Sequence, residues 1–381
     1  MNGFIVEENR GVYGAKMKVI GVGGGGGNMI NHMIREGYDR IDLIVANTDS
    51  QALEGSLAKT KIQLGANKTK GLGAGMNPDV GKEAAEESYD TLKDALEYSD
   101  IVFISTGMGG GTGTGAAPVV ARAAKENKAL TIGVVTTPFR FEGKKRSRLA
   151  EAGITELKKE CDSILVIPNE KLLTLIDKKA GIKESFKMVD DVLARAVNGM
   201  SSIIIDSGDS DINLDFSDVK KIMSHRGLAL MGVGVSEGED AAKEAVQDAI
   251  QSPLLDDMSI NGAMGVLIHF KIHPDCSLIE ISQAVSLVEN AAHDDADIIF
   301  GTTSDPSIEN NRVEVTLIAT GFEHSQKEVK ETPKEDAKST LDETRRQIIN
   351  RHRLQKVSGG FDISDTYDEL DEPSFMRNQM D

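Results

Sequence analysis

Tryptophan is absent from this chain of 381 residues, and aromatic residues make up only 4% of it. The core must therefore consist mainly of Ile, Val, Leu, Ala and Met. The two cysteines, Cys161 and Cys276, are too few for a disulfide framework and are typical of a reducing compartment. No apolar run is long enough to cross a bilayer, and the first fifteen residues are mixed and polar. We therefore expect a cytoplasmic protein with no signal peptide and no direct membrane insertion.

Positive charge is also scarce, because 43 Lys and Arg stand against 61 Asp and Glu and the formal net charge is −18. Binding of nucleic acid through its phosphates needs concentrated Lys and Arg, so we expect no nucleic-acid partner. An anionic ligand must then be held locally, by backbone N–H groups or a counter-ion, against the field of the whole protein.

The phosphate-binding motif G-x-x-x-x-G-K-[ST] and the kinase motifs are missing, which argues against a P-loop enzyme or a kinase. Glycine, however, occurs 38 times and is clustered. Five consecutive glycines at 23–27 separate an apolar strand at 16–22 from an expected helix at 28–37. A second loop, GMGGGTGTGAAP at 107–118, leads from a strand into a helix whose first turn we expect to contain Pro118.

Both loops have the features of a phosphate site. Bare backbone brings N–H groups close to a ligand, and a helix N-terminus adds partial positive charge. Thr112 and Thr114 are expected to donate hydroxyl hydrogen bonds to phosphate oxygens. Two such loops at adjacent strand ends can hold one polyphosphate from two sides, whereas a single loop can also be an ordinary flexible turn.

Short apolar strands alternate with helical patterns in the first half of the chain. They are expected at 16–22, 41–47, 100–107, 130–138 and 163–169. This alternation indicates a parallel sheet with helices on both faces, and such sheets bind ligands outside the carboxyl ends of their strands. The second half carries further strands, expected at 227–236, 263–272, 296–304 and 312–320. We predict an α/β protein with a Rossmann-like parallel sheet, a long central helix and a smaller α+β domain with a mixed sheet.

Changes in composition set the expected domain boundaries. We expect a flexible N-terminus at 1–15, a ligand-binding domain at 16–181 and a central helix at 182–206. After these we expect an α+β domain at 207–322, a disordered linker at 323–366 and a partner-binding peptide at 367–381. The linker is polar and charged, and its segment 341–357 can form a basic amphipathic helix. The final peptide places Leu370, Phe375 and Met376 among charges, which is typical of a motif that folds on a partner.

Five motifs in the order GVGGGGGN, ANTDSQAL, GLGAGMNP, GMGGGTGTGAAP and PFRFEG resemble those of the FtsZ family, the bacterial tubulin homologues of cell division. The resemblance covers 16–322 and the extreme tail. It implies the tubulin/FtsZ fold and a GTPase that polymerises head to tail into filaments of the cytokinetic ring. It also implies GTP as substrate, Mg²⁺ bound mainly through the GTP phosphates, and a location at the midcell division site beneath the inner membrane. The tail would then bind membrane-tether and other division proteins such as FtsA.

The resemblance also assigns residues to the nucleotide. The phosphates would be held by Gly23, Gly24, Gly25, Gly26, Gly27, Asn28, Gly107, Met108, Gly109, Gly110, Gly111, Thr112, Gly113 and Thr114. Asn47 and Asp49 would lie near the phosphates and Mg²⁺. The γ-phosphate would be covered by Ala74, Gly75, Met76 and Asn77. Glu142 would hold the ribose, and the base side would consist of Arg146, Asn169, Phe186 and Asp190.

Phe186 and Asp190 also make chemical sense as a pair, because residues four apart share a helix face. Phe186 can stack on a purine. Asp190 can accept hydrogen bonds from guanine N1–H and the exocyclic amine, which selects GTP over ATP. The alternative is that Phe186 belongs to the core and Asp190 is solvated.

Candidate hydrolytic residues lie much later, in DINLDFSDVKKIM. Asp215 and Asp218 can converge on a water molecule, with Asn213 in support, or can simply cap the helix that follows. The segment resembles the FtsZ loop that acts on the nucleotide of the next subunit. A helix of about 24 residues spans roughly 35 Å, so this loop cannot reach the nucleotide of its own subunit. A head-to-tail contact that does not close builds filaments.

Two other functions remain open from the sequence. The first glycine loop with Asp49 also fits an NAD-dependent oxidoreductase, although that hypothesis leaves the second loop and the Asp215 segment unexplained. A nucleotide-binding scaffold without hydrolysis is the other alternative. His269 and His273 stand four apart near Asp275 without a third clear ligand, so we expect structural histidines and assign no certain metal ligand.

Overall fold

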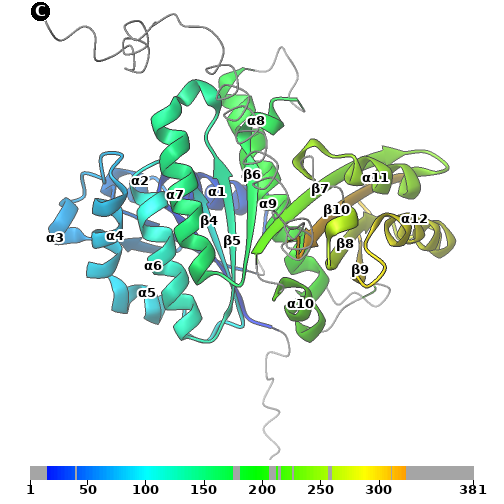
Figure 1. Cartoon of the computed structure of the whole chain (residues 1–381), viewed down its shortest axis with the longest axis horizontal. Coiled ribbons are helices and arrows are strands. Elements are labelled where there is room, and N and C mark those ends of the chain that lie inside the picture. The colour runs from blue at the N-terminus through cyan, green and yellow to red at the C-terminus, as the bar shows by residue number, and fades with distance from the viewer. Residues whose placement is uncertain are drawn as a thin grey trace, which may run out of the picture. The chain divides into compact units, whose positions relative to one another are not determined.

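The computed structural model describes residues 15–38, 41–174, 181–205, 212, 216–224, 227–255, 260–309 and 311–322. The linker, its segment 341–357, the C-terminal peptide and residues 1–14 lie outside this part of the chain. The described strands form one ten-stranded sheet in the order β3-β2-β1-β4-β5-β6-β7-β10-β8-β9 (Figure 1). The fold is the predicted α/β class, with a parallel region followed by a mixed region.

Six parallel strands form the first region. They are β1 (Met17–Val22), β2 (Asp42–Asn47), β3 (Thr60–Gln63), β4 (Ile101–Gly107), β5 (Leu130–Thr137) and β6 (Ser163–Pro168). The central strands are apolar along almost their whole length because both faces of the sheet are covered. Strand β3 was not predicted, since TKIQ is short and half polar. Its place at the edge of the sheet tolerates that composition.

Helices cover both faces of this region (Figure 1). They are α1 (Gly23–Arg35), α2 (Ser50–Glu54), α3 (Ala66–Thr69), α4 (Pro78–Glu87), α5 (Tyr89–Ala95), α6 (Thr112–Glu126), α7 (Lys144–Glu160) and α8 (Asn169–Leu172), with a 3₁₀ turn at Arg140–Glu142. One apolar cluster packs α4 to α7 on one face of the sheet, and a second packs α1 on the other. The helices thereby leave the carboxyl ends of β1, β4 and β5 accessible for a site.

The predicted long helix is α9 (Ile182–Ile205), which has 24 residues. Its apolar side, including Leu193, Val197 and Met200, belongs to the same cluster as α1. That cluster also contains Leu267 of β8 and Ile318 of β10, so α9 packs against both regions of the sheet (Figure 1). The short helix α10 (Phe216–Met223) follows it in the chain.

The mixed region is built on β7 (Gly227–Glu237). Its first residues pair in parallel with β6, and the rest pairs antiparallel with β10 (Arg312–Thr320). Strand β10 also pairs antiparallel with β8 (Gly265–Ile272), which pairs in parallel with β9 (Asp297–Ser304). The helices of this region are α11 (Ala241–Ile250) and α12 (Leu278–Ala291), with 3₁₀ turns at Pro253–Leu255 and Ile260–Gly262. Strand β7 therefore joins what the sequence predicts as two separate sheets.

Two predicted helix starts are wrong. Helix α1 begins at Gly23 instead of residue 28, because this glycine-rich turn packs directly on the sheet. A Cβ at Gly26 would lie 2.3 Å from the Ser105 carbonyl oxygen, so tertiary packing overrides the low helix propensity of glycine. Helix α6 begins at Thr112, which places Pro118 inside the helix instead of in its first turn. Helices α4 and α5 are separated at Ser88.

Candidate nucleotide site

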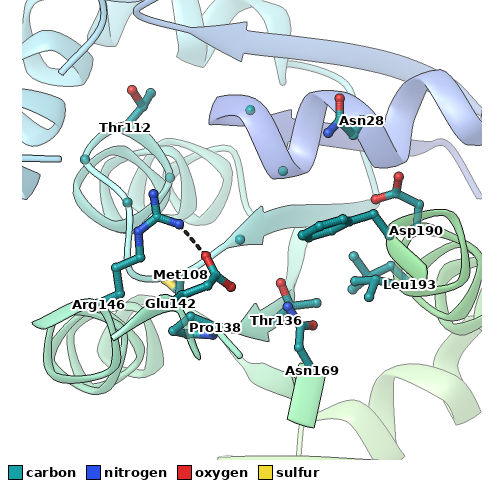
Figure 2. A pocket seen from close by; sticks show the side chains of 18 residues that line it. Asn28, Met108, Thr112, Thr136, Pro138, Glu142, Arg146, Asn169, Asp190 and Leu193 are labelled. Carbon is teal, nitrogen blue, oxygen red and sulfur yellow. Dashed lines mark hydrogen bonds and ion pairs between the residues drawn. The ribbon is translucent and has the colours of Figure 1, made fainter. Parts of the chain in front are cut away.

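A pocket of about 370 Å³ opens at the carboxyl ends of the parallel strands, where such sheets bind ligands (Figure 2). Fourteen of the predicted nucleotide-binding residues line it: Gly24, Gly25, Asn28, Gly107, Met108, Gly110, Gly111, Thr112, Gly113, Glu142, Arg146, Asn169, Phe186 and Asp190. The sequence thus predicts most of the lining, although these residues are spread over more than 160 positions of the chain.

The two glycine loops touch each other through their backbones. A Cβ at Gly23, whose φ is +71°, would lie 2.9 Å from the backbone nitrogen of Gly113. A Cβ at Gly25 would lie 3.0 Å from the backbone nitrogen of Gly107. Any side chain at these positions would push the loops apart. The glycines therefore serve contact between the loops as well as access for a ligand.

Two helix N-termini meet at the pocket. Neither α1 nor α6 has a side-chain cap, and neither has an acidic residue in its first turn. The first N–H groups of each helix have no partner within the helix, and the helix dipole adds partial positive charge there. Gly24 and Gly25 of α1 and Thr112 of α6 line the pocket at these ends. The arrangement fits an anion such as a polyphosphate, even in a chain with a net charge of −18.

The two threonines of the second loop have different surroundings. The Thr112 hydroxyl oxygen lies 2.6 Å from that of Thr48, and Thr112 lines the pocket. Thr114 is buried, its hydroxyl oxygen accepts a hydrogen bond of 2.9 Å from the Gly109 N–H, and it is not part of the lining. Thr114 thus stabilises the loop through a hydrogen bond within it. A sequence pattern alone cannot distinguish this structural role from a contact with phosphate.

Glu142 and Arg146 form an ion pair on one side of the pocket, and Asn169 and Asp190 lie on the other (Figure 2). Glu142 is fixed further by the Phe139 N–H, which donates to its Oε1 at 3.0 Å. The Phe139 ring is buried and meets the Phe186 ring edge to face, with centroids 5.7 Å apart. Phe186 itself is 45% exposed, so its ring has free surface for a planar ligand.

Two polar groups define the far end of the pocket. Asn169 is 6% exposed, and its Oδ1 has no hydrogen-bond partner among the described residues. A buried amide left unpaired is costly, which indicates a ligand that completes it. Burial raises the pKa of Asp190 to about 6, while the charges of His32 and Arg35 act in the opposite direction. Carboxyl groups with shifted pKa values in a cleft are typical of functional sites.

Sequence reasoning missed four lining residues: Thr136, Pro138, Val189 and Leu193. Val189 and Leu193 follow Phe186 by three and seven positions, so helical periodicity can place them on its face. Thr136 and Pro138 come from the carboxyl end of β5 and the residues after it, a position that only the strand order marks as part of the site.

Several predicted residues lie outside the lining. Gly23, Gly26, Gly27 and Gly109 belong to the loops but do not face the pocket, and neither do Asn47, Asp49, Ala74, Gly75, Met76 and Asn77. Asp49 caps α2 by accepting from the Gln51 and Ala52 N–H groups, and Asn77 caps α4. The segment with Ala74 nevertheless touches the second loop, since a Cβ at Gly111 would lie 2.8 Å from the Ala74 Cβ.

Of the three predicted hydrolytic residues the structure describes only Asp218, which is not part of the pocket lining. Asn213 and Asp215 lie outside the described residues, and Asp218 is exposed in the first turn of α10. The residues of α9 that line the pocket are near its N-terminus, whereas α10 comes after its C-terminus. A helix of 24 residues is about 36 Å long. His269, the other polar candidate, bonds to Thr303 of β9 at 2.9 Å.

The fold and the pocket define an α/β protein whose pocket fits a nucleotide, with two uncapped glycine-rich helix starts at the end suited to phosphate. Two family models match the chain: the Tubulin/FtsZ family GTPase domain over residues 16–177 and the FtsZ family C-terminal domain over 227–323. A cell division protein FtsZ of Helicobacter pylori is 50% identical over 313 residues, which are 82% of this chain and 81% of that protein. The chain belongs to the Tubulin/FtsZ family.

Solved structures agree with this assignment. An FtsZ dimer of M. jannaschii matches with a TM-score of 0.77 and 45% identity, covering 81% of this chain and 89% of that one. A CetZ2 protofilament of Haloferax volcanii with bound GTPγS matches with a TM-score of 0.68 over 89% of this chain and 99% of that one, and at 18% identity it supports the fold alone. The chain is therefore a tubulin-like GTPase that binds GTP, and the matches do not support the oxidoreductase hypothesis. None of the helices in the described residues is long and apolar enough to span a membrane.

Proposed function

We propose that this GTPase polymerises head to tail into filaments of the bacterial cytokinetic ring and hydrolyses GTP at the contact between subunits. One observation carries the proposal: among the described residues, the lining of the pocket offers a nucleotide site but no carboxylate free to act on the phosphates. Among the described residues, the carboxylates in its lining are Glu142 and Asp190. Glu142 is paired with Arg146, and Asp190 lies at the far end with Asn169.

In this proposal the base occupies the end of the pocket formed by Phe186, Asn169 and Asp190. The ring of Phe186 stacks on guanine, and the Asp190 carboxylate accepts from N1–H and the exocyclic amine. The buried Oδ1 of Asn169, which has no partner among the described residues, accepts a further hydrogen bond from the base. Adenine does not offer the same donors, and a site with buried polar groups rejects an analogue that leaves them unpaired. The site therefore selects GTP over ATP.

The phosphates lie against the two glycine loops, with Ala74, Gly75, Met76 and Asn77 closing over the γ-phosphate. Mg²⁺ is bound mainly through phosphate oxygens. Asn47 and Asp49, just outside the lining, are close to the second loop through the bond between Thr48 and Thr112. The metal would neutralise charge that develops on the phosphates.

The hydrolytic groups come from the next subunit. Asp215 and Asp218 position and polarise the attacking water, and Asn213 supports them. This assignment rests on the resemblance of the segment to the FtsZ loop, and the length of α9, which precedes that segment in the chain, supports it. A contact between two different surfaces that does not close generates a filament. The solved FtsZ relative described above is a dimer, which is consistent with association of this kind.

The tail at 367–381 extends the proposal to other proteins. It would bind membrane-tether and other division proteins such as FtsA, and the linker at 323–366 would give it reach. Filaments tethered in this way assemble at the midcell division site beneath the inner membrane. The domain boundaries predicted from the sequence are part of this proposal.

The test is phosphate release and light scattering with GTP, measured over a series of protein concentrations. We expect turnover per molecule to rise steeply above a threshold concentration, because each site is completed by a neighbour. Asp215→Ala should abolish turnover and leave GTP binding intact. Asp248→Ala, which removes an exposed carboxylate on α11, is the matched control and should behave as the wild type. A turnover per molecule that does not change with concentration would refute the shared site, and scattering without phosphate release would indicate a scaffold.

A further inference from the structure

His32 is a buried polar residue without a role in the site described above. It lies on α1, four positions after Asn28, which lines the pocket, and the two residues share a helix face. The side chain is 5% exposed among apolar neighbours of the same helix such as Met29 and Met33. An apolar residue would fill this space without the cost of burying a polar ring.

The contact of His32 is with α9. Its Nε2 lies 3.4 Å from Oδ1 of Asp191, and Oδ2 of Asp191 accepts a hydrogen bond of 2.8 Å from Nε of Arg195. Arg195 in turn lies 3.7 Å from Glu314 of β10. Asp191 is therefore held from two sides, by α1 and by its own helix. Rotation of α9 about its axis would break the contact of Asp191 with His32 and that of Arg195 with Glu314.

Asp191 is the immediate neighbour of Asp190, which faces the base end of the pocket. Successive residues on a helix are about 100° apart, so an anchor on one of them fixes the direction of the other. Figure 2 shows Asn28 on α1 and Asp190 on α9 at the same side of the pocket. The same helix that presents its N-terminus to the phosphates therefore also orients the residue that reads the base.

We propose that His32 is a positioning residue for guanine recognition, which holds α9 through Asp191 so that the Asp190 carboxylate meets the base. This inference rests on the proposed role of Asp190. The charge of His32 also acts on Asp190, since it opposes the rise of its pKa that burial causes, and Arg35 acts in the same direction. His32 therefore supports the ionised form that accepts two hydrogen bonds.

The test compares the affinities for GDP and for inosine diphosphate, which lacks the exocyclic amine. We expect wild-type protein to prefer GDP at least about tenfold, because a charge-assisted hydrogen bond is lost with inosine. His32→Asn keeps a polar side chain, but its amide takes the position of Nδ1. The asparagine side chain is therefore too short to reach Asp191. It should lower the preference about threefold or more. His32→Gln places its amide near Nε2 and should restore the preference to within about twofold of wild type.

The matched control is Asn31→Ala on the same helix. Asn31 accepts from Ser56 Oγ at 3.1 Å and from the Leu57 N–H at 2.7 Å, so it ties α1 to a loop instead of α9. It should cost stability without changing the preference for GDP. Thermal unfolding of each variant shows whether it is folded, and the preference is a ratio that a general loss of stability does not move.

The outcomes separate this inference from the proposed function. If Asp190→Asn keeps the preference for GDP, the guanine contact of Asp190 is wrong and the role of His32 falls with it. If Asp190→Asn loses the preference but His32→Asn keeps it, His32 does not position Asp190 and the guanine contact stands. Equal loss of affinity for both nucleotides in His32→Asn would show a purely structural tie between the helices, and would also overturn the inference.

Discussion

Replacing Asp190 by asparagine removes a carboxylate from the base end of the pocket while keeping the size and shape of the side chain. Burial raises the pKa of this group from its ordinary value of 3.8 to about 6, and the charges of His32 and Arg35 limit the rise. The folded protein without nucleotide therefore binds the proton on Asp190 more tightly than the unfolded chain does. At neutral pH, where Asp190 is ionised, folding carries the cost of desolvating that charge.

The size of this cost follows from the two pKa values. A shift of about two units corresponds to about 3 kcal/mol at a pH well above 6. Because the side chain is only partly buried, screening by solvent reduces this figure, and we expect about 1–2 kcal/mol. Since the folded pKa is raised, the stability that protonation provides is fully present below pH 4 and is lost as the pH rises through 6. Asn does not titrate, so Asp190→Asn should be more stable than wild type at pH 8 and similar to it near pH 4.

The assay is thermal unfolding of the nucleotide-free protein at pH 8 and at pH 4.5, with wild type and Asp190→Asn side by side. At about 2 °C per kcal/mol for a chain of this size, the variant should unfold about 2–4 °C higher at pH 8. In parallel, GDP affinity of the wild type should fall as the pH drops below 6, and that of the variant should be weak throughout. By the same pKa values about a third of the gain remains at pH 4.5, so a variant no more stable than wild type at pH 8, or a gain as large at pH 4.5 as at pH 8, would refute the desolvation argument.

Two further substitutions test the site. Gly26→Ala places a Cβ 2.3 Å from the Ser105 carbonyl oxygen and should lower the free energy of unfolding, measured in urea, by about 1–3 kcal/mol. The control Gly24→Ala has no atom within 4 Å of its Cβ and should not lower the free energy of unfolding. An equal loss of stability at both positions would contradict the packing argument. Asn169→Ala removes the unpaired buried amide, so GDP affinity measured by calorimetry should fall about tenfold while the unfolding free energy of the nucleotide-free protein changes by less than about 1 kcal/mol. A large loss of stability with unchanged affinity would show that Asn169 is structural.

Much of the parallel region was predictable because its signals are local. Strands β1, β2, β4, β5 and β6 are apolar runs, and their observed bounds lie within one or two residues of the predicted ones. The glycine loops were identifiable because a phosphate site needs bare backbone between a strand and a helix. The start of α1 at Gly23 was not predictable, because glycine has a low helix propensity. The close packing of Gly26 on Ser105 of β4, which leaves no space for a Cβ, is a tertiary contact.

The site shows the same division. Phe186 and Asp190 were paired from helical spacing, which is a property of the sequence alone. The burial of Asn169, the inward position of Thr114 and the contact between His32 and Asp191 follow no local pattern. The last two residues are 159 positions apart, and their contact depends on how α1 and α9 pack on the same face of the sheet.

The sequence by itself determined the positions of the apolar strands and of the long helix, where the backbone is bare enough for phosphate, and which helix carries the candidate base-binding pair. These properties depend on residue type and spacing over a few turns of chain. The tertiary structure alone decided that the two glycine loops meet, that β7 joins the two regions into one sheet, and that Glu142 and Asp190 are the carboxylates of the pocket lining among the described residues. These properties depend on contacts between segments that are distant in the sequence. Such contacts stabilise the protein only after the packed core has offset the conformational entropy lost in bringing the segments together.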